Sequence, residues 1–148
     1  MTDHTSLTKE CDTSIRVLVA DDHAIVRKGI CALLATEADI EVVGEAVDGQ
    51  SAIEQVERLR PDVVLMDLVM PKMDGIDAFH ALQKLNPKVR VVISSGFSRD
   101  AAISHLFEQG LAGFIQKPYR QTELGRVVAR AIHPAEAEAE TPDVGKQQ

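Results

Sequence analysis

Three short runs of apolar residues constrain the fold of this chain more than any other feature. They are I-R-V-L-V-A at residues 15–20, V-V-L-M at 63–66 and V-R-V-V-I at 89–93. Apolar residues follow one another in these runs with little alternation, which is typical of strands covered by helices on both faces. The runs therefore predict parallel strands in the middle of a sheet.

Segments with apolar residues three and four positions apart separate these runs, and two weaker apolar runs lie at residues 40–43 and 113–116. This spacing predicts helices, which we expect near residues 25–34, 51–59, 76–85, 101–109 and 121–132. The alternation indicates an α/β fold: a five-stranded parallel sheet in the order 2-1-3-4-5, with five helices on two faces and the weaker runs at the sheet edges.

The two ends of the chain differ from this regular core. Residues 1–13 are polar and carry a net charge of −2, and residues 133–148 are rich in Ala and Glu and carry −3 of the total of −7. We expect a flexible N-terminal tail at 1–13, one domain at 14–132 and an acidic disordered tail at 133–148.

Charge and composition argue against several classes of function. An acidic chain without a run of Lys or Arg is not typical of proteins that bind nucleic acid or anionic membranes directly. No apolar run approaches the roughly 18 residues of a membrane span, and residues 1–12 lack the apolar core of a secretion signal. Cys11 and Cys31 form no disulfide framework or metal-ligand pattern, which fits the cytoplasm. We therefore expect a cytoplasmic protein that contacts neither nucleic acid nor membrane.

Polar side chains follow the ends of the predicted strands. Asp21 and Asp22 follow the run at 15–20, and Asp67 follows the run at 63–66. Ser95 follows the run at 89–93, and Lys117 follows the run at 113–116. The carboxyl ends of parallel strands share one edge, so these groups should meet in one cleft. Three carboxylates repel one another unless a hard cation such as Mg²⁺ is present, and a lysine and a hydroxyl can hold phosphoryl oxygens. The pattern indicates a Mg²⁺-assisted phosphoryl site.

Two other chemistries on such a fold fit less well. A flavin or dinucleotide site needs a Gly-rich or hydroxyl-rich loop after the first strand, where this chain has D-D-H. A phosphatase of the haloacid dehalogenase type would have a second Asp two residues after Asp67, where this chain has Val69. His23, beside the acid pair, is interpreted as a solvent-facing residue of a loop or helix start rather than a metal ligand or proton carrier.

Four phrases together resemble the receiver domain of bacterial two-component response regulators. They are V-L-V-A-D-D-H, P-D-V-V-L-M-D-L-V-M-P-K-M-D-G, V-V-I-S-S-G and G-F-I-Q-K-P-Y, and they span most of residues 14–132 in the family's order and spacing. The resemblance implies a flavodoxin-like domain that accepts a phosphoryl group from a histidine kinase or a phosphotransfer protein and that requires Mg²⁺ as its cofactor.

The resemblance also implies residue roles. Asp67 would be the phosphoacceptor, Asp21 and Asp22 would hold Mg²⁺ together with Asp67, and the backbone carbonyl of Val69 would complete the protein's metal ligands. Lys117 would contact the phosphoryl group.

The remaining implied residues belong to a conformational switch. Ser95 would move toward the phosphoryl group and Phe114 would fill the space that it leaves, which changes the face made by the fourth helix, fifth strand and fifth helix. Pro118 would follow a cis peptide bond. This face would contact a downstream protein, or a second copy of the chain in a homodimer formed on activation.

The output of the domain is open at this stage. About 16 residues follow the last predicted helix, fewer than a second domain needs, so the leading interpretation is a stand-alone, non-enzymatic response regulator. The alternatives are a receiver cut from a longer hybrid kinase or transcription factor, and a Mg²⁺-dependent phosphohydrolase. The apolar residues Val69 and Phe97 flank the predicted path of water to Asp67, so we expect slow self-dephosphorylation.

Overall fold

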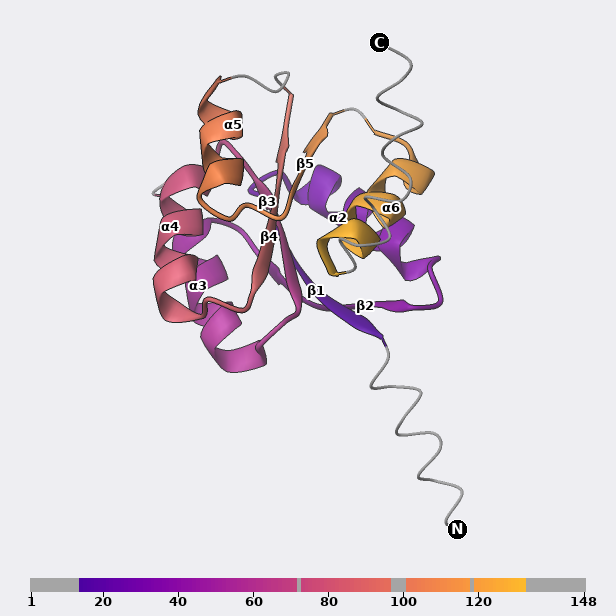
Figure 1. Cartoon of the computed structure of the whole chain (residues 1–148). Coiled ribbons are helices and arrows are strands. Elements are labelled where there is room, and N and C mark those ends of the chain that lie inside the picture. The colour runs from indigo at the N-terminus through magenta and orange to yellow at the C-terminus, as the bar shows by residue number, and fades with distance from the viewer. Residues whose placement is uncertain (1–13, 72, 97–100, 118, 133–148) are drawn as a thin grey trace.

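The computed structural model describes residues 14–71, 73–96, 101–117 and 119–132. Strands and helices alternate along this part of the chain (Figure 1). The strands are β1 (Ile15–Ala20), β2 (Ile40–Ala46), β3 (Val63–Asp67), β4 (Arg90–Ser95) and β5 (Gly113–Gln116). The helices are α2 (Ala24–Ala35), α3 (Gly49–Leu59), α4 (Gly75–Leu85), α5 (Ala101–Glu108) and α6 (Gln121–Ile132). The tails predicted at 1–13 and 133–148 lie outside the described residues.

The five strands form one parallel sheet in the order β2-β1-β3-β4-β5, which confirms the predicted topology. Helices α3, α4 and α5 cover one face of this sheet, and α2 and α6 cover the other (Figure 1). Each face has its own apolar core: Phe79 and Leu82 of α4 pack on one side, and Leu34 of α2 and Leu124 of α6 on the other. Burial on both faces explains why β1, β3 and β4 have so few polar residues.

Strand β2 is three residues longer than its apolar run predicts. It continues through Gly44, Glu45 and Ala46, which pair with the end of β1. Gly and Glu are uncommon in strands, so the sequence signal stops early. Glu45 is held in place by two cations, because the Nε of Arg27 donates to its carboxylate at 2.9 Å and the Nζ of Lys28 at 3.3 Å.

Side-chain caps determine where two of the helices begin. Asp48 precedes α3, and its carboxylate accepts a hydrogen bond from the backbone N–H of Ser51 at 2.8 Å while the Ser51 hydroxyl accepts one from the backbone N–H of Asp48. Asp74 precedes α4 and accepts from the backbone N–H of Asp77 at 2.9 Å. These caps satisfy N–H groups that have no partner inside a helix. They place the start of α3 two residues before its predicted position.

The first residue of α4 lies directly against the loop that follows β3. The backbone N–H of Gly75 donates to the carbonyl of Leu68 at 2.8 Å. A Cβ at position 75 would lie 2.7 Å from the carbonyl oxygen of Asp67 and 2.9 Å from the Cα of Leu68. Only glycine therefore allows α4 to begin so close to the end of β3.

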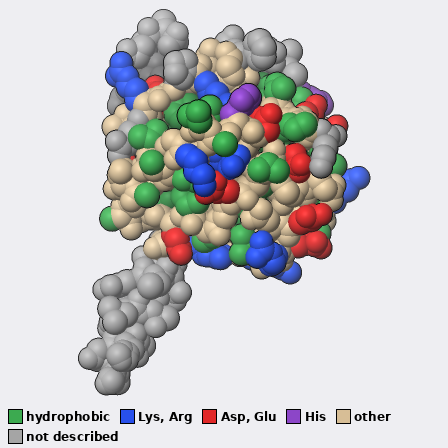
Figure 2. Space-filling view, turned by 180° about the vertical axis from the view of Figure 1, so that it is seen from behind, with side chains coloured by type: hydrophobic (Ala, Val, Ile, Leu, Met, Phe, Trp, Pro, Cys, Tyr) green, Lys and Arg blue, Asp and Glu red, His purple; other side chains and the backbone are tan. Residues whose placement is uncertain are grey.

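The surface of the described residues carries both signs of charge. On the face shown in Figure 2, Lys and Arg side chains lie next to Asp and Glu side chains, and hydrophobic side chains surround these charged groups. Among the residues that the structure describes, no helix is both long enough and apolar enough to cross a membrane.

Substitution of Gly75 tests the close contact between α4 and β3. We expect Gly75→Ala to lower the free energy of unfolding by about 1–3 kcal/mol, because the new methyl group meets backbone atoms that can yield only by moving the helix. Urea denaturation followed by circular dichroism measures the change.

Gly29→Ala is the matched control for this experiment. Gly29 is exposed in the middle of α2, and a Cβ there meets no atom within 4 Å. We expect this substitution to raise the free energy of unfolding by about 0.5–1 kcal/mol through helix propensity. Equal effects of the two substitutions would contradict the proposed clash at Gly75.

Candidate functional site

Backbone hydrogen bonds join the carboxyl ends of neighbouring strands. The N–H of Asp21, after β1, donates to the carbonyl of Ala46 in β2 at 3.0 Å. The N–H of Leu68 donates to Ser94 in β4 at 2.9 Å, and the N–H of Lys117 donates to Ser95 at 2.7 Å. Backbone hydrogen bonds therefore fix the residues that follow β1, β3 and β5 against the neighbouring strand.

The ammonium group of Lys117 lies between two buried carboxylates. Its Nζ is 3.2 Å from an oxygen of Asp21 and 3.4 Å from an oxygen of Asp67. Asp21 is 1% exposed and Asp67 is 6% exposed. Hydrogen-bonded charge pairs of this kind are strong in a poorly hydrated site, so Lys117 draws the ends of β1, β3 and β5 together.

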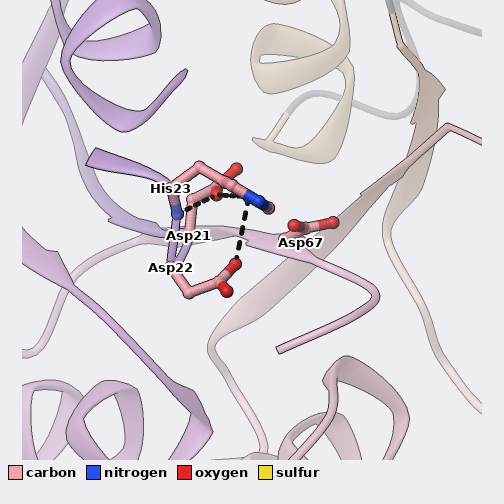
Figure 3. Close-up of side chains that lie close together, drawn as sticks. All are labelled: Asp21, Asp22, His23 and Asp67. Carbon is pink, nitrogen blue, oxygen red and sulfur yellow. Dashed lines mark hydrogen bonds and ion pairs between the residues drawn. The ribbon is translucent and has the colours of Figure 1, made fainter. Parts of the chain in front are cut away.

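Asp22 and His23 lie at the more open side of the same cluster. One oxygen of Asp22 is 3.2 Å from the Nδ1 of His23, and an oxygen of Asp21 is 3.5 Å from that nitrogen. Figure 3 shows the ring of His23 turned toward these carboxylates, with Asp67 beside it. One ligand atom from each of Asp21, Asp22, His23 and Asp67 lies within 4.8 Å of every other. The predicted acid cluster is therefore present, with His23 as an additional member.

The carboxyl group of Asp67 has a raised pKa, chiefly because burial disfavours its charged form. The ammonium of Lys117 opposes this shift, the nearby charge of Asp21 adds to it, and a hydrogen bond from the backbone N–H of Val69 opposes it. Asp67 is thus a desolvated carboxylate whose negative charge one neighbouring cation offsets only in part.

Other predicted residues lie around this cluster. Ser95 ends β4 and is 2% exposed. Phe114 in β5 is half-buried and pairs in register with Ile93 of β4. The side chain of Val69 is exposed, as expected for a residue at the rim of the site. The predictions for Phe97 and Pro118 fall outside the described residues.

Two residues near the cluster were not predicted from the sequence. Arg27, one turn into α2, donates from Nη1 to the backbone carbonyl of Asp21 at 2.8 Å and from Nε to Glu45 at 2.9 Å. Tyr119 follows Lys117 by two residues, and the pKa of its hydroxyl is raised by burial and by the charges of Asp21 and Asp67. The sequence signal for this contact of Arg27 was its position in the first turn of a predicted helix, four residues after His23.

The donor set of the cluster fits a divalent cation. Carboxylate oxygens are the ligands that Mg²⁺ prefers. Asp21, Asp22 and Asp67 supply three carboxylates, and the ammonium of Lys117 contacts two of them. Burial raises the pKa of Asp67 although the Lys117 ammonium lies beside it. A bound cation would stabilise the charged carboxylate further.

The sheet order and the acid cluster at its carboxyl edge are those of a receiver domain. The model of the response regulator receiver domain family matches residues 17–129. The chain belongs to this family.

Individual relatives agree with this assignment. The chain is 36% identical over 119 residues to the response regulator protein VraR of Staphylococcus saprophyticus. The aligned region covers 80% of this chain and 57% of that protein. The chain thus spans little more than half the length of the curated relatives it matches. The receiver domain of the response regulator NarL from Mycobacterium tuberculosis has a TM-score of 0.74 and 36% identity, covering 80% of this chain and 96% of that one.

A third similarity concerns the expectation that the protein avoids nucleic acid. The response regulator RcsB of Salmonella typhimurium, whose conformational dynamism for DNA interaction has been described, has a TM-score of 0.73 and 28% identity, covering 79% of this chain and 60% of that one. Because receivers of this kind occur in proteins that interact with DNA, the acidic charge of this chain does not support the exclusion of nucleic acid.

Removal of one buried charge should stabilise the protein when no divalent cation is present. We expect Asp67→Asn to raise the free energy of unfolding, because burial disfavours the charged form of Asp67 and the neutral amide has no charge to desolvate. Lys117 keeps Asp21 as its partner, and the amide oxygen can still accept the N–H of Val69. Urea denaturation in EDTA measures the difference.

The exposed Glu57 in α3 provides the control. We expect Glu57→Gln to change the free energy of unfolding by less than about 0.5 kcal/mol. A loss of stability in Asp67→Asn would show that the carboxylate of Asp67 is stabilised in the folded protein, contrary to the geometry described above.

Proposed function

We propose that this chain is a phosphoacceptor in a two-component phosphorelay and that Asp67 receives the phosphoryl group. The observation that carries the proposal is the position of the Lys117 ammonium within 3.4 Å of Asp67 and 3.2 Å of Asp21. This arrangement supports a carboxylate nucleophile with a cation ready to bind a phosphoryl oxygen and two acids ready to bind a metal.

The proposed step transfers the phosphoryl group from a phosphohistidine to Asp67. An oxygen of the Asp67 carboxylate attacks phosphorus, so a P–O bond forms while the P–N bond breaks. The imidazole leaves with the electron pair of that bond and takes up a proton. Lys117 pairs with the transferred oxygens, and the backbone N–H of Val69 orients the attacking carboxylate.

Asp21, Asp22 and Asp67 are the proposed ligands of Mg²⁺, with the backbone carbonyl of Val69 as a fourth. When bound, the metal neutralises charge on the phosphoryl oxygens. Two hydrogen bonds hold Asp21 in position: Arg27 donates to its backbone carbonyl and Lys117 donates to its carboxylate.

We propose that phosphorylation changes the packing of Ser95 and Phe114. Ser95 lies buried at the end of β4, where it pairs in register with Gln116 of β5. Phe114 packs against the core beneath α4 and α5, and on its other side it lines a hollow with Arg126 and Arg130 of α6. A shift of Ser95 toward a phosphoryl oxygen would alter this packing, and Phe114 has no hydroxyl group, so its response depends on packing alone.

The proposed partners are a histidine kinase or phosphotransfer protein and a downstream protein, with a homodimer as a second form of output. Two apolar side chains in the first turn of α2 support a protein contact beside the acid cluster: Ile25 is 88% exposed and Val26 is 37% exposed. A cytoplasmic location is typical of the family, and we include it in the proposal.

Incubation with phosphoramidate and MgCl₂ tests the proposed chemistry. We expect the intact mass to rise by one phosphoryl group, to fail to rise in EDTA and to fail to rise in Asp67→Asn. The matched control is Asp77→Asn, which changes an exposed aspartate in α4 and should not affect the gain. A phosphoryl group that appears in Asp67→Asn would assign the modification to another residue and refute the proposal.

The lifetime of the phosphorylated state is a separate expectation. Water that hydrolyses an acyl phosphate must be oriented, and the side chain of Val69, 61% exposed at the rim of the site, offers no polar group for this purpose. We expect slow decay in the wild type and decay several-fold faster in Val69→Asn.

The decay is measured by intact mass after removal of the phosphodonor. Val47→Asn introduces the same side chain at a position that is 50% exposed in the loop between β2 and α3, and it should leave the decay unchanged. Unchanged or slower decay in Val69→Asn would contradict the proposed effect of the apolar side chain.

A further inference from the structure

We propose that His23 is a nitrogen ligand in the metal site and that the site therefore also takes a borderline transition metal, of the class of Co²⁺, Fe²⁺, Ni²⁺ or Zn²⁺. This inference rests on the proposed metal centre and extends it. His23 is solvent-facing at the start of α2, as the sequence predicted, with a side chain that is 68% exposed. One of its ring nitrogens nevertheless lies within the acid cluster (Figure 3).

The distances around His23 match those between neighbouring ligands of one metal ion. Its Nδ1 is 3.2 Å from an oxygen of Asp22 and 3.5 Å from an oxygen of Asp21. With metal–ligand bonds of about 2.1 Å, adjacent ligands in an octahedral site are about 3 Å apart and opposite ligands about 4.2 Å apart. All four ligand atoms lie within 4.8 Å of one another, which is close to this range.

The position of His23 at the start of α2 leaves its side chain available for this contact. His23 is the N-cap residue of α2, yet its side chain forms no capping hydrogen bond with the helix. Its own backbone N–H donates to the carboxylate of Asp21 at 2.9 Å, which holds the residue against the cluster. The side chain is 68% exposed, so metal binding through Nδ1 leaves the other ring nitrogen in water.

A nitrogen donor changes which metals the site prefers. Three carboxylates alone favour hard cations such as Mg²⁺, whereas imidazole favours the borderline transition metals. Removal of His23 should therefore weaken the binding of Co²⁺ much more than the binding of Mg²⁺. A histidine that only pairs with Asp22 would not produce this difference.

The test uses Co²⁺ and the full chain without a histidine affinity tag. Proton NMR of the Co²⁺-bound protein, with its histidine rings isotope-labelled for assignment, should contain the signal of a carbon-bound imidazole proton shifted far outside the normal range. Calorimetry with CoCl₂ and MgCl₂ should give a ratio of Co²⁺ to Mg²⁺ affinity that falls about tenfold in His23→Ala. The control is His105→Ala, because His105 is 66% exposed and lies 3.5 Å from a carboxylate oxygen of Glu108.

Loss of the shifted signal in His23→Ala but not in His105→Ala would support the inference. A shifted signal that persists in His23→Ala, or none in the wild type, would overturn it. Phosphorylation of the wild type with Mg²⁺ is measured separately. If that reaction occurs while Co²⁺ gives no histidine signal, only the role of His23 fails. If it does not occur, the proposed phosphoacceptor function fails.

Discussion

The structure depends on a concentration of negative charge at one edge of its sheet. Asp21 and Asp67 are almost fully buried there, and Lys117 is the cation that contacts both. Burial of like charges is unfavourable unless a cation and a rigid backbone hold them. The hydrogen bonds between strand ends, the Arg27–Glu45 pair and the close approach of Gly75 all supply this rigidity. The stability of the domain and its proposed chemistry therefore depend on the same few residues.

Much of this organisation could be predicted from the sequence. The apolar runs of β1, β3 and β4 identify buried parallel strands because they lack alternation, and the topology follows from the alternation with helices. The acids after β1 and β3 and the lysine after β5 were predicted to converge, since the edge of a parallel sheet brings them together whatever the details of the loops.

The residues that sequence reasoning missed depend on side-chain geometry. Glu45 extends β2 beyond its apolar run because Arg27 and Lys28 bind it, and no local propensity encodes such a pair. His23 is exposed at the start of α2, as predicted. Its additional contact of 3.2 Å with Asp22 depends on the rotamer of the ring, which the sequence does not determine.

The position of Tyr119 has a practical consequence. The chain contains one tyrosine and no tryptophan, so its tyrosine emission comes from a single, partly buried ring two residues from Lys117. Carboxylates and cations near a phenol quench its fluorescence to different degrees, and the charges of Asp21 and Asp67 already act on this hydroxyl group. Tyrosine emission is therefore a label-free way to test for events at the acid cluster in real time.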